Sequence, residues 1–182
     1  IGLTRIMHGL AKKFVIAELL IMPFFGTVTD GETLIARLDG LPTHEVWGFL
    51  VLTYLAAYLD FSAYSDIAIG TSRLYGLKIM ENFNWPILAP NIGNFWKRWH
   101  MTLAGWCQAY VYMPTIGLTR NPYLAVYATF IAMGLWHAGS LNWVMWGLWH
   151  ASGVAIFLSF SRLRRRRKWT FLDRRPWCWA CL

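Results

Sequence analysis

A run without a single Asp, Glu, Lys or Arg extends from Asn121 to Ser161 and limits what this chain can fold into. A helix needs about 20 apolar residues to cross the hydrocarbon core of a bilayer, so the run has the length for two passes. The alternative is a buried hairpin in the core of a large soluble protein. The composition argues against it, because 57% of the residues are hydrophobic and only 14% are charged, against about 25% in soluble domains. We therefore predict an all-α, polytopic membrane protein.

The formal net charge of +8 is concentrated at the C-terminal end of the chain. Residues 162–182 contain eight of the 17 basic side chains and one acid, Asp173, whereas residues 1–161 are nearly neutral. A basic cluster directly after an apolar segment is typical of the cytoplasmic side of a membrane and attracts anionic lipid headgroups. Nucleic-acid binding is the other use of such a cluster, but nothing else in the sequence indicates a nucleic-acid partner. We predict a membrane domain over residues 1–161, a basic cytoplasmic tail over 162–182, and membrane lipids as partners.

The two ends of the chain carry weak signals. The first residue is Ile1, and no signal-peptide pattern follows it. We therefore expect that the N-terminal helices of a longer protein are missing and that they are partners of this piece. Cys178 and Cys181 form a lone CxxC. A zinc site would need two further ligands, and no redox-type fold surrounds the pair, which favours chance or packing within the tail.

The pattern of apolar and polar residues predicts a series of helices. Residues 6–25 favour a helix that starts at the membrane interface, with the stems of Lys12 and Lys13 extending their ammonium groups to water. Residues 27–45 and 81–93 are typical of loops. The other predicted segments are a helix from Val46 to about Gly76, an amphipathic interfacial helix over 94–114 that Pro114 closes, and two apolar segments, 122–137 and 141–160, separated by the HAGS sequence at 137–140.

Ionisable groups inside such apolar segments cost several kcal/mol, so each one needs a reason. For Asp60 and Asp66 the sequence favours a structural role, either joining helices or anchoring Arg73, over direct acid–base chemistry. His150 lies among tryptophans in the last apolar segment, where packing is the better interpretation.

The spacing between His137 and His150 is one that also occurs in haem-binding membrane helices. Four axial ligands would require a second such pair, which the other histidines do not offer, and the HAGS sequence would interrupt the helix. A metal site is disfavoured as well, because two imidazoles with this spacing on one helix lie about 20 Å apart. We predict no bound metal or cofactor.

His137 is followed by Ala138 and Gly139, small residues that permit a local break and let a ligand reach the imidazole. A neutral imidazole can remain in a dry site and still accept a proton near neutral pH. The residues alone leave two interpretations open: a general base, or a histidine that hydrogen-bonds a neighbouring helix.

Four stretches occur in an order and spacing that resemble one family: DFSAYSDIAIG (60–70), ENFNWP (81–86), NFWKRWHMTLAGW (94–106) and GLWHAGSLNWVMWGLWH (134–150). They resemble the membrane-bound O-acyltransferases, and among these the bacterial alginate O-acetylation branch, which is akin to the D-alanine transferase of teichoic acid modification. The resemblance covers residues 1–160. It departs at the WCQAY sequence of 106–110, where family members often have W-L-R-D-Y and therefore a charged pair.

The resemblance implies a ring of transmembrane and tilted helices around a tunnel in the bacterial inner membrane. An acyl thioester, either acetyl-coenzyme A or an acyl carrier protein thioester, would enter from the cytoplasm. The acceptor on the other face would be a hydroxyl of a polysaccharide such as alginate, or a downstream periplasmic acetyltransferase. The family motifs place the catalytic histidine at His137 and a second polar position at His100. They also imply substrate-binding roles for Asn94, Trp96, Arg98 and Trp136.

In the reaction that the resemblance implies, His137 takes the proton of the acceptor hydroxyl, while His100 and Asn94 orient the substrates or stabilise developing charge. No covalent acyl-enzyme is required. Cys107 is the candidate nucleophile, and packing is its better interpretation. Two other functions stay open: a transport or channel subunit lined by intramembrane Asp and His residues, and an inactive truncated remnant.

Overall fold

The computed structural model describes residues 2–25 and 41–168, and this part of the chain consists of helices and loops without a strand. The prediction of an all-α protein is confirmed. The helices form two compact units, residues 1–81 and residues 82–182. The expectations for residues 27–40 and for the pair Cys178 and Cys181 concern residues outside the described ranges.

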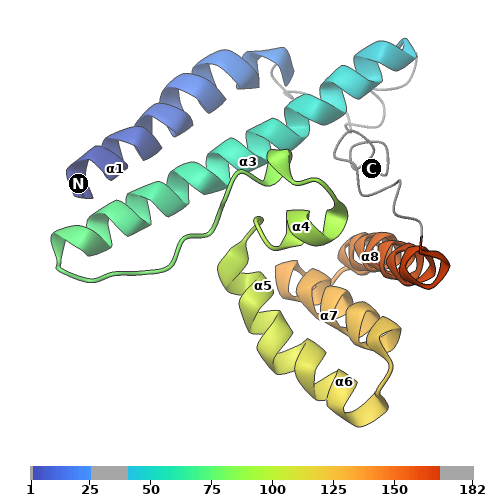
Figure 1. The fold of residues 1–182 in the computed structure, drawn as a ribbon. Coiled ribbons are helices and arrows are strands. Elements are labelled where there is room, and N and C mark those ends of the chain that lie inside the picture. Colours follow the sequence, from blue (N-terminus) through green and yellow to red (C-terminus); the bar gives the residue numbers. More distant parts are fainter. Residues whose placement is uncertain (1, 26–40, 169–182) are drawn as a thin grey trace. The chain divides into compact units, whose positions relative to one another are not determined.

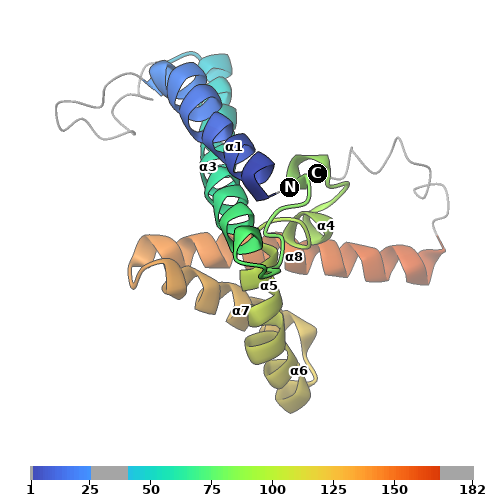
Figure 2. The same ribbon diagram turned by 90° about the vertical axis from the view of Figure 1, so that its left-hand side faces the viewer.

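The first unit is a pair of helical arms that lie side by side (Figure 1, Figure 2). The first arm consists of α1 (Gly2–Leu10), the π-helix η1 (Ala11–Ile21) and the 3₁₀ turn η2 (Met22–Phe25). The second arm is the single long helix α3 (Thr43–Leu74). The first arm thus begins at Gly2, four residues before the predicted start.

Small residues bring these two arms into close contact. A Cβ atom added to Gly2 would lie 2.9 Å from the carbonyl oxygen of Gly70, and one added to Gly9 would lie 2.7 Å from that of Ala63. The two pairs run in opposite directions along the chain, so the arms are antiparallel. Helices in lipid associate through small residues of this kind, because close backbone approach provides the van der Waals contact that holds them together.

An ionic network joins the same two arms. Asp66 is 6% exposed, and its carboxylate accepts hydrogen bonds of 2.6 Å from Arg5 Nε and from Lys12 Nζ. Arg5 also donates to Glu81 through Nη1 at 3.0 Å. Each of these bonds links residues more than 50 positions apart in the sequence.

The ion pairs of this network show which of the roles predicted for Asp60 and Asp66 is correct. Asp66 joins the arms as described, and Asp60 pairs with Lys13 of the first arm, so the helix-joining role is confirmed. Arg73 is not anchored by these acids and lies 3.8 Å from Glu81 instead. The expectation that Lys12 extends to water is wrong, because the buried carboxylate of Asp66 offers its ammonium group a charged partner.

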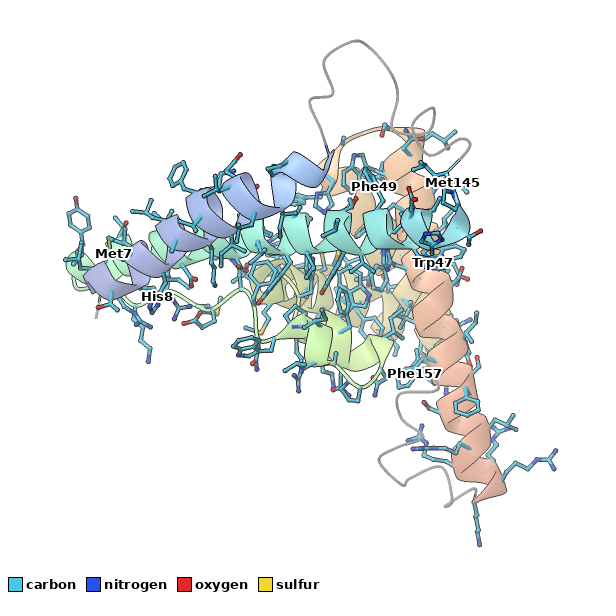
Figure 3. The ribbon with its side chains drawn as sticks, turned by 90° about the horizontal axis from the view of Figure 1, so that it is seen from above. Met7, His8, Trp47, Phe49, Met145 and Phe157 are labelled. Carbon is cyan, nitrogen blue, oxygen red and sulfur yellow. The ribbon has the colours of Figure 1, made fainter. Side chains whose placement is uncertain are left out.

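Two helices of the described chain are long and apolar enough to cross a membrane, α3 with 32 residues and α8 (Leu141–Arg167) with 27. Only 11% and 17% of their most apolar windows are buried within the protein. The large apolar side chains exposed on them include Trp47 and Met145, whose positions Figure 3 shows. An apolar surface of this kind is suited to contact with lipid rather than water.

The basic cluster that follows the last apolar segment belongs to α8. Arg164, Arg165, Arg166 and Arg167 form the last turn of the helix, and Lys168, which follows it, adopts the left-handed conformation. Cations are favoured there, because the C-terminal end of a helix carries a partial negative charge. The helix therefore continues six residues past Ser161, the predicted end of the membrane domain. The domain division itself stays a prediction.

The second unit contains a helical hairpin and a group of short helices before it. The hairpin is formed by α7 (Pro122–His137) and α8, and its core contains Cys107, Val126, Phe130, Met133 and Ala151. The short elements are η3 (Pro86–Leu88), α4 (Ile92–Trp96), α5 (Met101–Cys107), η4 (Gln108–Tyr112) and α6 (Met113–Thr119).

Glycines set the crossing of α7 and α8. A Cβ atom on Gly147 would lie 2.5 Å from the carbonyl oxygen of Phe130, and one on Gly134 would collide with the carbonyl group of Trp143. Helix α4 lies against α8 at Phe157 (Figure 3), whose Cε1 would be 3.0 Å from a Cβ on Gly93. The second unit is thus closely packed at three glycines, and at Gly134 and Gly147 an added Cβ would collide with backbone atoms of the facing helix.

The single interfacial helix predicted over 94–114 is wrong in two respects. The segment is interrupted after Trp96 and restarts at Met101, because His100 adopts a left-handed conformation. It also continues past Pro114, which occupies the first turn of α6. Proline lacks an N–H and crowds the carbonyl of the residue four positions earlier. The preceding residues form the π-helix η4, in which Met113 N–H bonds to the carbonyl oxygen of Gln108, and the chain stays helical across the proline.

Candidate active site

His137 is the last residue of α7 and is exposed. The helix stops there because Ala138 turns to an extended conformation with φ −167° and ψ 146°. The N–H of Ala138 still donates to the carbonyl oxygen of Gly134 at 3.3 Å. The imidazole therefore stands at the negative end of the helix dipole, a position that favours a group that becomes positively charged. The local break predicted from Ala138 and Gly139 is confirmed.

Three indoles surround the imidazole of His137. Trp143 of α8 is stacked on it, with ring centroids 4.4 Å apart and an angle of 14° between the planes. Trp136 and Trp146 approach at steep angles, with centroid distances of 4.9 and 5.6 Å. The exposed histidine is thus held in an aromatic setting built from both helices of the hairpin.

His100 lies at the break between α4 and α5, with φ 44° and ψ 55°. Hydrogen bonds to Asn82 hold the backbone in place at this break. The backbone carbonyl of Asn82 accepts from Met101 N–H at 2.9 Å, and its side-chain oxygen accepts from Thr102 Oγ1 at 2.6 Å. A further backbone bond of 3.0 Å runs from Asn84 N–H to the carbonyl oxygen of Arg98. The ENFNWP sequence thereby fixes the backbone on both sides of His100.

His100 and His137 share one neighbour, the indole of Trp136. The rings of His100 and Trp136 lie 5.9 Å apart, and Trp136 contacts His137 as described. Burial, and to a smaller extent the charge of His137, lowers the pKa of His100 to about 4. His100 is therefore neutral near pH 7 and can take part in hydrogen bonding without adding a positive charge beside His137.

Trp96 and His150 form a second aromatic group beside the first. Trp96 contacts Phe130, Trp146 and His150 with centroid distances of 4.9, 5.9 and 5.1 Å. His150 is half-buried and lies 4.6 Å from Trp146. These contacts agree with the packing interpretation of His150. For Trp96 they show a place in the core of the hairpin, so its substrate-binding role stays a prediction.

The structure overturns the separation expected between His137 and His150. The two residues belong to different helices, α7 and α8, and their ring centroids lie 5.6 and 4.6 Å from that of the same indole, Trp146. The wide separation expected from the sequence assumed one continuous helix, which the break at Ala138 rules out. Over the described ranges, however, no three His, Cys, Asp or Glu side chains come together as a metal site would require.

The remaining predicted site residues lie in the same unit. Trp136 is 60% exposed and borders both histidines. Asn94 is in α4, where its N–H donates to Asn91 Oδ1 at 2.8 Å as part of the helix N-cap. Arg98 is half-buried in the turn before His100. The structure thus brings His137, His100 and Trp136 together, while the binding roles of Asn94 and Arg98 stay predictions.

Sequence reasoning missed Asn82, Trp143 and Trp146 as parts of the site. A signal for the two tryptophans was present, because positions 143, 146 and 150 have the spacing of one helix face. No local pattern indicates that Asn82 caps a helix 20 residues later. Cys107, by contrast, is a packing residue as the sequence predicts: it is 1% exposed, and burial raises the pKa of its thiol.

Comparison with known proteins identifies the family of this chain. The sequence model described as MBOAT, membrane-bound O-acyltransferase family, matches residues 2–182. The chain belongs to this family. Its membrane character and the resemblance found in its motifs are thereby confirmed.

Three relatives show what kinds of protein the chain is similar to. The probable alginate O-acetylase AlgI of Pseudomonas putida is 38% identical over 160 residues, which cover 85% of this chain and 31% of that protein. The peptidoglycan O-acetyltransferase of Helicobacter pylori is 31% identical over 93% of this chain and 32% of its own length. The teichoic acid D-alanyltransferase of Bacillus subtilis is 28% identical, over 92% and 43% respectively. The chain spans about a third of the length of the two acetyl-transferring relatives.

Proposed function

We propose that the protein transfers an acetyl group from a thioester to a hydroxyl of an extracytoplasmic polysaccharide such as alginate. Membership of the MBOAT family supports an acyl transfer, and the names of the relatives support acetyl as the group and a cell-surface polymer as the acceptor. The observation that carries the proposal is the position of His137, an exposed imidazole at a helix end with neutral His100 close by.

In the proposed reaction His137 accepts the proton of the acceptor hydroxyl as the oxygen attacks the thioester carbonyl. The C–S bond breaks, the thiolate leaves, and the proton held on His137 is transferred to it. A positioned base of this kind contributes typically about 10²–10⁴-fold. His100 stabilises the negative charge that develops on the carbonyl oxygen, because a neutral imidazole N–H can donate a hydrogen bond to it. The buried thiol of Cys107 takes no part.

The donor in this proposal is acetyl-coenzyme A or an acyl carrier protein thioester. Trp136 suits an acceptor contact, because its exposed indole lies next to both histidines. Asn94 and Arg98 would orient the substrates. The immediate acceptor is the polymer or a downstream periplasmic acetyltransferase that passes the group on. The protein would reside in the bacterial inner membrane as a multi-pass protein whose missing segments complete the fold, with the basic end of α8 on the cytoplasmic side.

The test is complementation with the full-length protein in a strain that lacks it, followed by measurement of ester acetate on the cell-surface polymer. We expect His137→Ala to lower acetate by about 10²-fold or more, since the proton acceptor is removed. His8→Ala is the matched control, because His8 is exposed on α1 in the other unit, and it should leave acetate unchanged. Equal acetate in the wild type and in His137→Ala, at equal membrane levels, would refute the proposal.

The same experiment examines the transport alternative. A channel or carrier would show altered flux in the histidine variant without any change of ester acetate. The acidic residues give that alternative little support, since Asp60 and Asp66 are paired with Lys13, Arg5 and Lys12 within the first unit. An inactive remnant would show no acetate difference between the wild-type protein and an empty vector.

A further inference from the structure

We propose that Trp143 is the positioning residue of His137, holding the imidazole plane in the orientation that proton transfer needs. The proposal rests on the function proposed above. Its direct observation is the parallel stack of the two rings, with centroids 4.4 Å apart and planes 14° from parallel. Of the three indoles around His137, Trp143 is the one that covers a face of the imidazole, since the other two stand at 72° and 76° to it.

The crossing of α7 and α8 produces this stack. Gly134 lies one turn before His137, and residues three apart on a helix lie on the same face. The absence of a side chain at Gly134 lets the backbone of α8 approach so closely at Trp143 that a Cβ would collide with its carbonyl. The indole of Trp143, on the same residue, therefore reaches over the end of α7. Gly134 and Trp143 thus act together: the glycine permits the close approach of the two helices, and the indole then stacks on His137.

An exposed histidine at the end of a helix needs a neighbouring side chain that restricts the orientation of its imidazole. Gly139, in the loop after His137, is exposed, and a Cβ added to it would have nothing within 4 Å. A free imidazole there would sample several rotamers. Proton transfer requires the accepting nitrogen within hydrogen-bond reach of the hydroxyl, and a misplacement of about 1 Å can cost about 10²-fold in rate. Stacking on a large flat ring restricts the imidazole at both χ angles.

The stack also suits the charge change of the reaction. When His137 takes the proton it becomes a cation, and the face of an indole attracts cations. Trp143 itself cannot accept the proton, because its N–H is a donor only. Its role is therefore to position and stabilise His137 and not to touch the reacting atoms.

The experiment compares Trp143→Phe and Trp143→Leu in the full-length protein, with kcat and KM measured for both substrates in native membranes. We expect Trp143→Phe to keep most of the activity, because it retains a flat face. Trp143→Leu should lower kcat by about 10- to 100-fold while KM changes little. Trp149→Leu is the matched control, since Trp149 lies on the same helix and is 79% exposed, and it should match the wild type.

A second measurement does not depend on acyl transfer. Diethylpyrocarbonate modifies accessible imidazoles, and mass spectrometry can follow His137 with His8 of the same chain as the reference. We expect His137 to react faster in Trp143→Leu than in the wild type or in Trp149→Leu, because one face of the ring is uncovered.

Two glycine-to-alanine variants test whether the close crossing of α7 and α8 produces the stack of Trp143 on His137. Gly134→Ala should separate Trp143 from His137 and reproduce both effects of Trp143→Leu. Gly117→Ala should produce neither, because a Cβ at Gly117 meets open space.

These measurements separate the two proposals. Full activity of His137→Ala would overturn the proposed function whatever Trp143 does. If His137→Ala is inactive but Trp143→Leu and Trp143→Phe have the same kcat and the same His137 reactivity, the positioning role is overturned alone. Equal losses in Trp143→Leu and Trp149→Leu would overturn it as well, because the effect would then be a general one on α8.

Discussion

At the scale of single residues, His100 shows how the surrounding chain imposes a conformation. A non-glycine residue with positive φ is uncommon, and such residues persist where their neighbours over-determine them. Three other residues of the described chain share this conformation, Trp85, Arg120 and Lys168. Arg120 and Lys168 end helices, as is common for left-handed residues. His100 instead precedes one, and the bonds of Asn82 to Met101 and Thr102 hold it there.

The low pKa of His100 predicts a pH dependence of stability. The value is about 4 in the folded protein and 6.5 for an ordinary histidine. Between these values the unfolded chain binds a proton that the folded one does not, so stability falls as the pH is lowered from 6.5 towards 4. In His100→Asn this contribution is absent, and Asn also tolerates a left-handed backbone. Thermal unfolding in detergent should show a smaller loss of Tm between pH 7 and 4.5 for the variant. Parallel Tm curves would contradict this.

At the scale of elements, the pairing of α3 with the first arm combines close glycine contacts with charges. The two kinds of contact differ in what they require. The contacts at Gly2 and Gly9 require only that these positions carry no side chain. The charged groups, by contrast, each require a partner of opposite charge, since an unpaired charge in lipid is costly. Asp66 is the centre of the network, because it is the buried member and binds two cations.

Asp66→Ala should therefore destabilise the first unit by on the order of 3 kcal/mol, because Arg5 and Lys12 lose their buried carboxylate. Asp60→Ala is the matched control. The side chain of Asp60 is 56% exposed, and its removal leaves Lys13 paired with Glu18 at 3.1 Å, so a clearly smaller effect is expected. Unfolding of the purified protein by denaturant titration in mild detergent measures both variants. Equal effects would show that burial of Asp66 does not distinguish it.

At the scale of the whole molecule, the charge asymmetry of α8 predicts its orientation in the membrane. The helix runs from uncharged Leu141, which is 75% exposed, to the arginines of its last turn. Basic residues next to a span remain on the cytoplasmic side. On a background in which serine replaces Cys178 and Cys181, Arg166→Cys should react with a membrane-impermeant maleimide only after the cells are permeabilised. Leu141→Cys should react in intact cells. The opposite pattern would invert the orientation of α8.

The sequence by itself determined the helical class, the membrane character, the family and the candidates His137 and His100. These follow from composition and from short motifs, which are properties of neighbouring residues. Tertiary structure alone decided the partner of Lys12, which lies 54 positions away at Asp66. It also decided the left-handed backbone of His100 and the stack of Trp143 on His137. Each of these depends on how closely two distant segments approach, and glycines and polar bonds set that approach without leaving a periodic pattern in the sequence.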